Sequence, residues 1–423
     1  MRNNDRSALD ISQIVSYLLL LFFFSTLIIA CKDSETKVGN TETKTSVVTQ
    51  LPNPVEGNSS LPRIFSNGKE IYMSWVEKKD SLAILKYASY SNGSWSDYLV
   101  ESSGSDWFVN WADFPVIAEN NGNIVSSFLQ KSATGTYTYD VKLNFFNSNT
   151  SFAKNNFVLH DDGTQSEHGF VSVRPYTGNS FLFTWLDGRE TVGKGHGQGA
   201  MTLRAALLFE DGTIDYDTLL DDRVCDCCQT ASAIGPDDEI IVAYRDRREG
   251  EIRDISVVRW DKKDGWSEPL PIGDDQWKID GCPVNGPAID SFGNTLAVAW
   301  FTAVGGEGKV QLVFSNDVGR SYGKPIRIDS GNATGRVDVV MLNETEAAVM
   351  WMEPDEVEET IRVLKVTSEG KKGDPITISH TSAERASGFP QLERLGNELF
   401  TAWTVVNKGT SSIKTATLSL DKL

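Results

Sequence analysis

The sequence predicts an all-β protein, a β-propeller of seven four-stranded blades. No stretch after Pro54 keeps a helical spacing of apolar residues, while short alternating strands recur between Gly, Asn and Asp turns. A short apolar run ending in an aromatic residue occurs seven times, with successive aromatics 51 to 59 residues apart. A repeat of about 50 residues with four strands has the length of a propeller blade. The seven aromatics are Trp75, Phe128, Trp185, Tyr244, Trp300, Trp351 and Trp403.

The fifth repeat shows the four strands of one blade most clearly. A lone four-stranded sheet cannot bury both of its faces, so neighbouring sheets must stack around a common axis. We expect the strands of this blade at residues 286–291, 295–302, 309–316 and 324–329.

The seventh repeat lacks a fourth strand, because the sequence stops at Leu423 soon after the expected third strand. Residues 45–51 (TSVVTQL) precede the first repeat and have the composition of a strand. We expect this segment to supply the missing outer strand, which would close the ring and remove an exposed edge. The alternative is that it belongs to a tether and leaves the last blade open.

Composition excludes some classes of function. The chain has 423 residues with 40% hydrophobic and 23% charged residues, which is a globular composition. Its formal net charge of −18 repels a phosphate backbone, so we expect no nucleic-acid partner. We expect a monomer.

The N-terminus has the features of an export signal. Arg2 and Arg6 precede an apolar run at residues 17–30 that is too short to span a bilayer and ends at a small residue. The residues IIAC, ending at Cys31, resemble the bacterial lipobox, which implies cleavage before Cys31 and attachment of lipid to its thiol. Lys32 in place of Asp implies sorting to the outer membrane, facing either the periplasm or the medium. A plain secretory signal or a membrane anchor are the alternatives.

These features predict three parts of the chain. Residues 1–30 are the expected lipoprotein signal peptide, residues 31–54 a tether that includes the closing strand, and residues 55–423 the propeller. We therefore expect a lipoprotein of the bacterial cell envelope that contacts the membrane only through its lipid.

The segment SNDVGRSY at residues 315–322 resembles the Asp box of sialidases and other BNR-repeat propellers. The wider chain, from about residue 55 to 420, is similar to bacterial sialidase-like proteins. This resemblance implies a propeller that acts as an exo-sialidase-like glycoside hydrolase on anionic glycans. The family has six blades and a catalytic tyrosine late in the chain, whereas no tyrosine follows Tyr322 here. In the segment PRIF, Phe65 also replaces a proline of the family, so whether the chain is an enzyme stays open.

Aligning the repeats on their aromatics places polar or thiol side chains just before each inner strand. Because inner strands surround the channel, we expect a site at its mouth, although a channel mouth can also be polar only because it is wet. These positions are Arg63, Asp113, His168, Cys228, Cys282, Arg336 and Ser387.

Charged residues also follow the second strands of the third and fourth repeats. Guanidinium groups suit bidentate binding of carboxylate or sulfate, as on an anionic sugar, although Arg–Asp pairs can also simply brace loops. We expect the acid or base among Asp113, His168 and Asp187. The expected ligand-binding arginines are Arg63, Arg189, Arg245, Arg247 and Arg336.

Four cysteines remain after Cys31. Cys225, Cys227 and Cys228 precede the inner strand of the fourth blade and Cys282 that of the fifth, so we expect Cys282 close to Cys227 or Cys228. Export to an oxidising compartment favours disulfides. The alternatives are a thiolate site for Zn or Cu(I), with His168 as a further ligand, and free redox thiols.

We thus expect an envelope-anchored, sialidase-like propeller that binds anionic glycans at its central funnel and, if it is an enzyme, hydrolyses them. One alternative is a metal-binding or redox propeller built on the four cysteines. The other is a non-catalytic scaffold for partner proteins. No cofactor is expected apart from the metal of the cysteine site.

Overall fold

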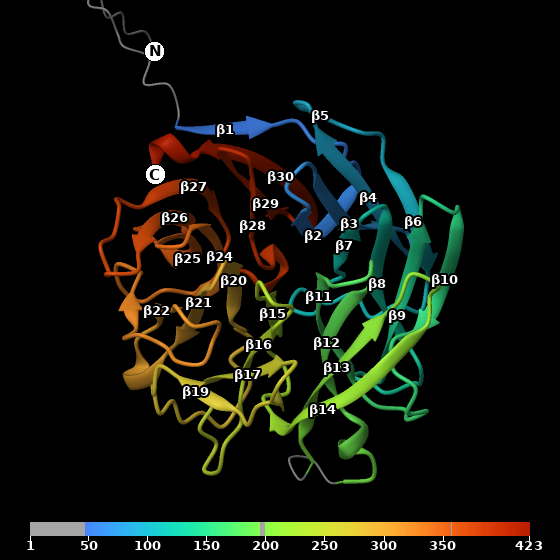
Figure 1. Ribbon diagram of the computed structural model, residues 1–423. Helices are drawn as coiled ribbons and strands as arrows, with labels where there is room; N and C mark the ends of the chain where they lie inside the picture. Colours follow the sequence, from blue (N-terminus) through green and yellow to red (C-terminus); the bar gives the residue numbers. More distant parts are fainter. Residues whose placement is uncertain (1–46, 195–198, 357) are drawn as a thin grey trace, which may run out of the picture. The chain divides into compact units, whose positions relative to one another are not determined.

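The computed structural model describes residues 47–194, 199–356 and 358–423. These residues form seven antiparallel sheets arranged as a ring, which confirms the predicted seven-bladed propeller (Figure 1). The expected signal peptide, the lipidation site Cys31 and the tether up to residue 46 lie outside the described residues. No described helix has the length and apolar character needed to cross a bilayer.

Each blade contributes one strand to an inner ring around the axis. Each inner strand contacts the inner strand of the next blade, all the way round the molecule. In blade order the inner strands are β2 (Asn58–Ser66), β7 (Ile117–Asn120), β11 (His168–Pro175), β15 (Ala231–Ile234), β20 (Ala288–Phe292), β24 (Gly335–Asn343) and β28 (Gln391–Leu395).

Further strands extend each blade outward. The second strands are β3 (Ile71–Lys79), β8 (Asn123–Lys131), β12 (Phe181–Asp187), β16 (Ile240–Arg245), β21 (Thr295–Thr302), β25 (Glu346–Pro354) and β29 (Glu398–Asn407). The third strands are β4 (Leu82–Ser91), β9 (Tyr139–Asn147), β13 (Met201–Leu208), β17 (Ile255–Asp261), β22 (Lys309–Ser315), β26 (Glu359–Thr367) and β30 (Thr410–Ser419).

The outer strands are more irregular. In two blades the outer strand consists of two short pieces that pair with the same third strand. These pieces are β5 (Ser94–Trp95) and β6 (Leu99–Gly104) in blade one, and β18 (Gly265–Trp266) and β19 (Leu270–Ile272) in blade four. The others are β10 (Phe152–Val158), β14 (Ile214–Val224), β23 (Ile326–Arg327), β27 (Ile376–Thr381) and β1 (Val48–Leu51). Four 3₁₀ turns complete the described structure: η1 (Arg189–Thr191), η2 (Val304–Gly306), η3 (Arg385–Ser387) and η4 (Leu420–Lys422).

The core lies between blades rather than within one sheet. The second strands are covered on both faces, and for this reason β12 and β21 have every side chain buried. Trp300 of β21, for example, shares a cluster with Ile241 and Ala243 of the preceding blade. The seven aromatics that mark the repeat are all buried, as packing between blades requires.

Blade seven joins the two ends of the propeller. β1 pairs antiparallel with β30, with Val48 opposite Leu418 and Leu51 opposite Thr415. The side chain of Asn53 then donates a hydrogen bond to the carbonyl of Ile413 at 3.1 Å. The predicted closing strand is confirmed, with its described part beginning at Val48.

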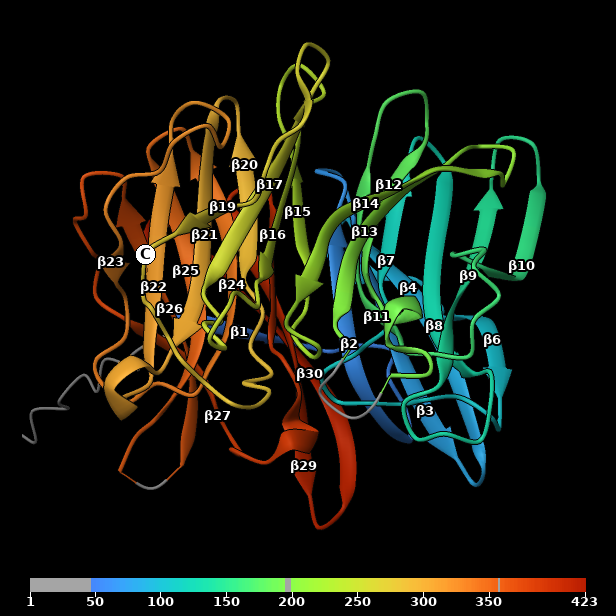
Figure 2. The ribbon, with the colours of Figure 1, turned by 90° about the horizontal axis from the view of Figure 1, so that it is seen from below.

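The ring has two different faces, seen edge-on in Figure 2. The face at the top of that view carries the turns from first to second and from third to fourth strands, such as the β9–β10 hairpin, and we call it the hairpin face. The opposite face carries the loops from second to third strands, such as the β29–β30 loop, and the loops that lead into the inner strands. We call it the crossover face.

Candidate functional site

The inner strands direct charged side chains toward the central channel. Five blades supply one such residue each, and Glu393 interacts electrostatically with the other four. Two of the five are guanidinium groups and three are carboxylic acids. They are Arg63 (β2), Arg174 (β11), Asp290 (β20), Asp338 (β24) and Glu393 (β28).

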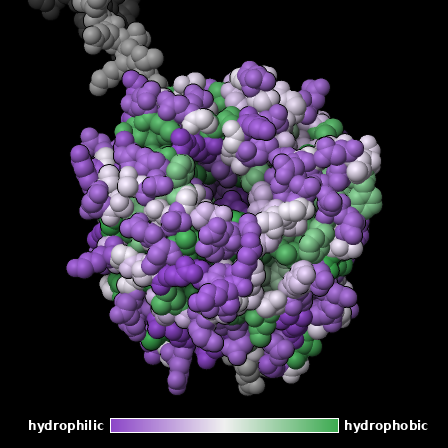
Figure 3. Space-filling model, in the orientation of Figure 1, coloured by the Kyte–Doolittle hydropathy of each residue, from purple (hydrophilic) through white to green (hydrophobic). Residues whose placement is uncertain are grey.

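The channel opens on the hairpin face into a cavity of about 620 Å³. Figure 3 looks onto this face and shows it hollowed at the centre, with hydrophilic residues around the hollow. The lining combines amides, carboxylates and cations with a few apolar side chains. Its members include Asn67, Lys69, Glu119, Asn120, Asn121, Arg174, Asp290, Phe65 and Pro175.

Arg174 lies at the base of this cavity with part of its guanidinium group available. Its Nε donates to the carbonyl of Ser232 at 2.6 Å, and its Nη2 donates to that of Ile289 at 3.4 Å. No residue within the described ranges accepts a hydrogen bond from Nη1. A ligand in the cavity can therefore reach one edge of a fixed guanidinium group.

Glu119 orders the rim of the same cavity. One of its carboxylate oxygens accepts from the side chain of Asn67 at 2.6 Å, and the other accepts from the backbone of Gly122 at 2.6 Å. The turns of blades one and two are thus connected directly. Because the side chains are already held in place, binding would order few of them.

Burial in the lumen shifts the pKa values of its charged groups toward the neutral forms. It raises the pKa of Glu393 to about 8 and also raises the pKa values of Asp290 and Asp338. It lowers the pKa of Arg63. At neutral pH the lumen therefore carries less negative charge than its three acids suggest.

Toward the crossover face the channel narrows. Arg63 donates from Nη1 to the side chain of Gln391 at 2.6 Å, and the space beside them is only about 50 Å³. Gln229 accepts a hydrogen bond from the backbone of Gly286 at 3.0 Å in the same section. The larger opening thus lies on the face opposite the one on which sequence reasoning placed the site.

Two of the predicted catalytic residues, His168 and Asp187, meet in a buried cluster between blades two and three. Nε2 of His168 lies 2.9 Å from a carboxylate oxygen of Asp162 and 3.6 Å from one of Asp187. The ring of His160 stacks on that of His168 with 3.6 Å between centroids. Burial, followed by the neighbouring His168, lowers the pKa of His160 to about 4.

The Asp187 carboxylate has structural partners of its own. It accepts hydrogen bonds from the indole of Trp185 at 2.9 Å and from Nη2 of Arg189 at 2.7 Å. Burial opposes ionisation, yet the hydrogen bond from Arg189 prevails and lowers the pKa of Asp187. His168 and Asp187 both have 0% exposed surface, so this cluster presents no open face to a glycan.

The third predicted catalytic residue, Asp113, lies in a different buried group. It accepts hydrogen bonds from the backbone of Phe170 at 2.7 Å and from the hydroxyl of Tyr139 at 3.0 Å. That hydroxyl also lies 2.8 Å from Glu167. Burial raises the pKa of Asp113 to about 7 and that of Glu167 to about 8. One phenolic proton cannot serve two carboxylates, so one acid of the pair holds a proton at neutral pH.

The predicted ligand-binding arginines separate into different environments. Arg63 lines the narrow section of the channel. Arg245 is buried and donates to the carbonyls of Asn285, Arg253 and Phe301. Arg336 is buried and donates to Ser387 and to the carbonyl of Gly388.

The other two predicted arginines pair with acids close to them in sequence. Arg189 binds Asp187, and Arg247 binds Glu251 at 3.0 Å. The structure therefore does not bring Arg189, Arg247 and Arg336 into one anion site.

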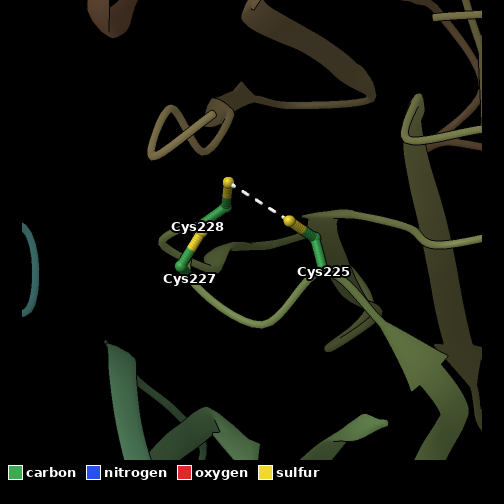
Figure 4. A group of neighbouring side chains, drawn as sticks. All are labelled: Cys225, Cys227 and Cys228. Carbon is green, nitrogen blue, oxygen red and sulfur yellow. Dashed lines mark hydrogen bonds between the residues drawn. The ribbon is translucent and has the colours of Figure 1, made fainter. Parts of the chain in front are cut away.

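The cysteines of the crossover face form a compact group (Figure 4). The sulfurs of Cys225 and Cys228 are 3.7 Å apart, and that of Cys227 completes a triangle with no side longer than 4.8 Å. Cys282 interacts with Cys225 and Cys227, so it lies beside the CxCC loop as expected. All four are free thiols, and His168 is not part of the group.

The guanidinium group of Arg253 lies beside these thiols. Nη1 of the buried Arg253 donates to the sulfur of Cys225 at 3.3 Å. Hydrogen bonds from Cys227 and the other thiols, together with Arg253, hold the pKa of Cys225 well below its ordinary value. The pKa values of the other three thiols are raised.

Comparison with known proteins extends only to the fold. No family model and no curated protein matches this chain. The BP39L lectin from Burkholderia pseudomallei matches with a TM-score of 0.62 and 11% identity, over 86% of this chain and 97% of the lectin. An ulvan lyase of a new polysaccharide lyase family, bound to a GlcA–Rha3S saccharide, matches with a TM-score of 0.55 and 12% identity, over 88% and 96%. A mutant of NanB sialidase from Streptococcus pneumoniae matches with a TM-score of 0.46 and 12% identity, over 89% of this chain and 71% of the sialidase.

Sequence reasoning missed most residues of the channel. Arg174, Asp290, Asp338 and Glu393 lie inside inner strands, whereas the site was expected at positions just before those strands. A usable signal was present for Arg174, Asp290 and Asp338, which are charged residues within largely apolar first strands, but not for Glu393, whose strand also contains Gln391 and Arg394.

Proposed function

We propose that this protein binds carbohydrate in the mouth of its central channel on the hairpin face. The observation that carries the proposal is the lining of the 620 Å³ cavity. Sugar hydroxyls both donate and accept hydrogen bonds, and the cavity offers amides, carboxylates and a guanidinium edge that do the same. Its volume lies within the range of roughly 300 to 1,000 Å³ that is usual for small-ligand sites.

The ligand in this proposal carries a carboxylate or a sulfate. The free edge of Arg174 and the exposed Lys69 supply positive charge at the mouth. Guanidinium groups bind carboxylate and sulfate in a bidentate manner. The pKa of Glu393 is raised to about 8, so this acid is mainly neutral at pH 7 and adds little to the repulsion that ionised acids exert on an anion.

The proposal is for binding and does not include hydrolysis. Asp113, His168 and Asp187 are at most 2% exposed, and each is hydrogen-bonded to protein groups. Glycoside hydrolysis needs two carboxyl groups that flank an accessible glycosidic bond. The buried positions of these residues support a binding protein better than a hydrolase.

Two structural neighbours support the proposal. One is named a lectin, and the other is a polysaccharide lyase solved with a saccharide of glucuronic acid and sulfated rhamnose. We also propose that a lipid on Cys31 holds the propeller, as a monomer, at the bacterial envelope. Support for this comes from the lipobox-like sequence IIAC.

A glycan array tests the binding proposal. The full-length protein is applied to neutral, carboxylated and sulfated oligosaccharides, and hits are titrated by calorimetry. Arg174→Ala should weaken binding about tenfold or more, the usual cost of losing a charged hydrogen bond. Arg320→Ala, which removes a half-exposed arginine of the β22–β23 loop, is the matched control. Absence of any binding, or equal affinities for both variants, would defeat the proposal.

A further inference from the structure

We propose that Cys225, Cys227, Cys228 and Cys282 form a structural centre for a thiophilic d¹⁰ cation, Zn(II) or Cu(I). The site lies on the crossover face between blades four and five. It is independent of carbohydrate binding on the hairpin face.

The spacing of the sulfurs matches a metal rather than a bond between them. A tetrahedral zinc ion with Zn–S bonds of about 2.3 Å holds its sulfurs about 3.8 Å apart. Cys225 and Cys228 are 3.7 Å apart, and Cys227 lies within 4.8 Å of both. A disulfide needs about 2.05 Å between its two sulfurs, and the separation of Cys225 and Cys228 is well beyond that.

Ligands come from two loops, as in many structural metal sites. Three follow directly after β14, the last strand of blade three, and the fourth, Cys282, lies in the loop before β20. Cys282 is exposed and hydrogen-bonds with Cys225 and Cys227, although its sulfur lies outside the triangle whose members are all within 4.8 Å of one another. An ion bound by all four therefore connects the loops that lead into blades four and five.

The electrostatic surroundings suit a site with excess negative charge. Four thiolates around Zn(II) carry a net charge of −2, and burying that charge needs nearby cations. Arg253 is 4% exposed and donates to the sulfur of Cys225 at 3.3 Å. Its other terminal nitrogen binds Glu251 at 2.7 Å, which fixes the guanidinium group in that position. Such hydrogen bonds from outside the ligand set orient ligands and stabilise the bound ion.

Burial indicates a structural centre. Cys225 and Cys228 have 0% and 2% exposed surface. Four protein ligands would fill the tetrahedral coordination of zinc and leave no position for a substrate. The next residue, Gln229, lines the narrow part of the channel, so the ion would also fix the crossover end of the channel.

Metal analysis of the purified full-length protein tests the proposal. Protein prepared with a phosphine reductant is measured by elemental mass spectrometry, and we expect about one zinc or copper per chain. Release by a zinc chelator or by a Cu(I) chelator distinguishes the two ions. Cobalt(II) serves as a second probe, because tetrahedral thiolate coordination gives intense visible and near-ultraviolet bands.

Variants assign the ligands. Cys228→Ser and Cys282→Ser should each lose most of the bound metal and the cobalt spectrum, while Cys31→Ser, the matched control, should keep both. Circular dichroism separates loss of ligand from loss of fold. If Cys228→Ser does not fold, the single change Cys282→Ser at an exposed position carries the test.

Three results would overturn the inference. One is metal-free protein whose mass is lower by the hydrogens of one or two disulfides. Another is metal-free protein with all thiols reactive and no cobalt bands after loading. The third is an unchanged metal content and cobalt spectrum in folded Cys282→Ser, which would remove the fourth ligand from the site.

Discussion

The hydroxyl of Tyr139 lies 2.8 Å from the carboxylate of Glu167, at a depth where Tyr139 has no exposed surface. The resemblance to sialidases implies a catalytic tyrosine late in the chain, whereas no tyrosine follows Tyr322. The pair in the structure is early, buried and shared with Asp113. Because the pair is buried and its pKa values are shifted, it should affect the stability of the fold.

Stability should therefore decrease as pH rises through neutrality. The pKa values of Asp113 and Glu167 are raised to about 7 and about 8, so the folded protein keeps protons that the unfolded chain releases. Their contribution is complete below the ordinary pKa values of 3.8 and 4.5 and is lost as pH rises through about 7 and 8. Between these limits each group lowers the free energy of unfolding by about 1.4 kcal/mol per pH unit.

Denaturant-induced unfolding from pH 5 to pH 8 measures how the free energy of unfolding changes with pH. Glu167→Gln should flatten this dependence, since the amide cannot ionise, whereas Glu268→Gln at an exposed position should leave it unchanged. A wild-type slope that is flat or rises with pH would contradict the assignment.

Binding of an anionic ligand should weaken above pH 8. Glu393 has a pKa of about 8, so it is mainly neutral at pH 7 and becomes negative as the pH rises. The new charge repels an anion and competes for Arg63 and Arg174. Calorimetry at pH 7 and pH 9 should show several-fold weaker binding for the wild type and a much smaller change for Glu393→Gln. An identical pH dependence in the two proteins would exclude Glu393 as the cause.

Replacement of Asp187 should destabilise the fold. The carboxylate is fully buried and binds Arg189, Trp185 and His168, so Asp187→Asn leaves a guanidinium group partly unpaired. Breaking a buried pair costs about 3 kcal/mol or more, and thermal or chemical unfolding should show this loss.

The control for Asp187→Asn is Asp217→Asn, which removes another acidic partner of Arg189 at a half-exposed position. That change should cost about 1 kcal/mol or less. Equal stability of Asp187→Asn and the wild type would contradict the structural role of this carboxylate.

Removal of the closing strand should expose an edge. A chain lacking residues 1–51 loses β1 and leaves β30 unpaired on one side. An open strand edge promotes association between chains, so we expect a lower melting temperature and oligomers in size-exclusion chromatography. A chain lacking residues 1–46 keeps β1 and serves as the control. Two truncations that behave alike would mean that β1 adds nothing to the ring.

The fold was largely predictable because every blade packs against its neighbours in the same way, so the pattern of buried residues repeats along the sequence. Each blade needs one large aromatic residue between sheets, and Trp75, Trp185 and Trp300 recur at the blade spacing for that reason. The closing strand followed from a missing partner in the last blade. The juxtaposition of Cys282 with the CxCC loop followed from the adjacency of blades four and five.

The site was less predictable because loops do not follow the repeat. Arg336 has the correct position to face the channel, but the loop around η3 folds over it and supplies carbonyl acceptors. Arg245 is likewise satisfied by backbone groups of the next blade. Repeat spacing places a residue on a blade, whereas it does not say what covers that residue.

The pairing of β1 with β30 also sets an order of events during biogenesis. The seventh sheet is complete only when β1, at the start of the described chain, has paired with β30, near its end. Contacts between such distant parts of a chain slow folding. A chain that is synthesised from its amino end would keep the edges of its first and last blades unpaired until nearly all of it had been made.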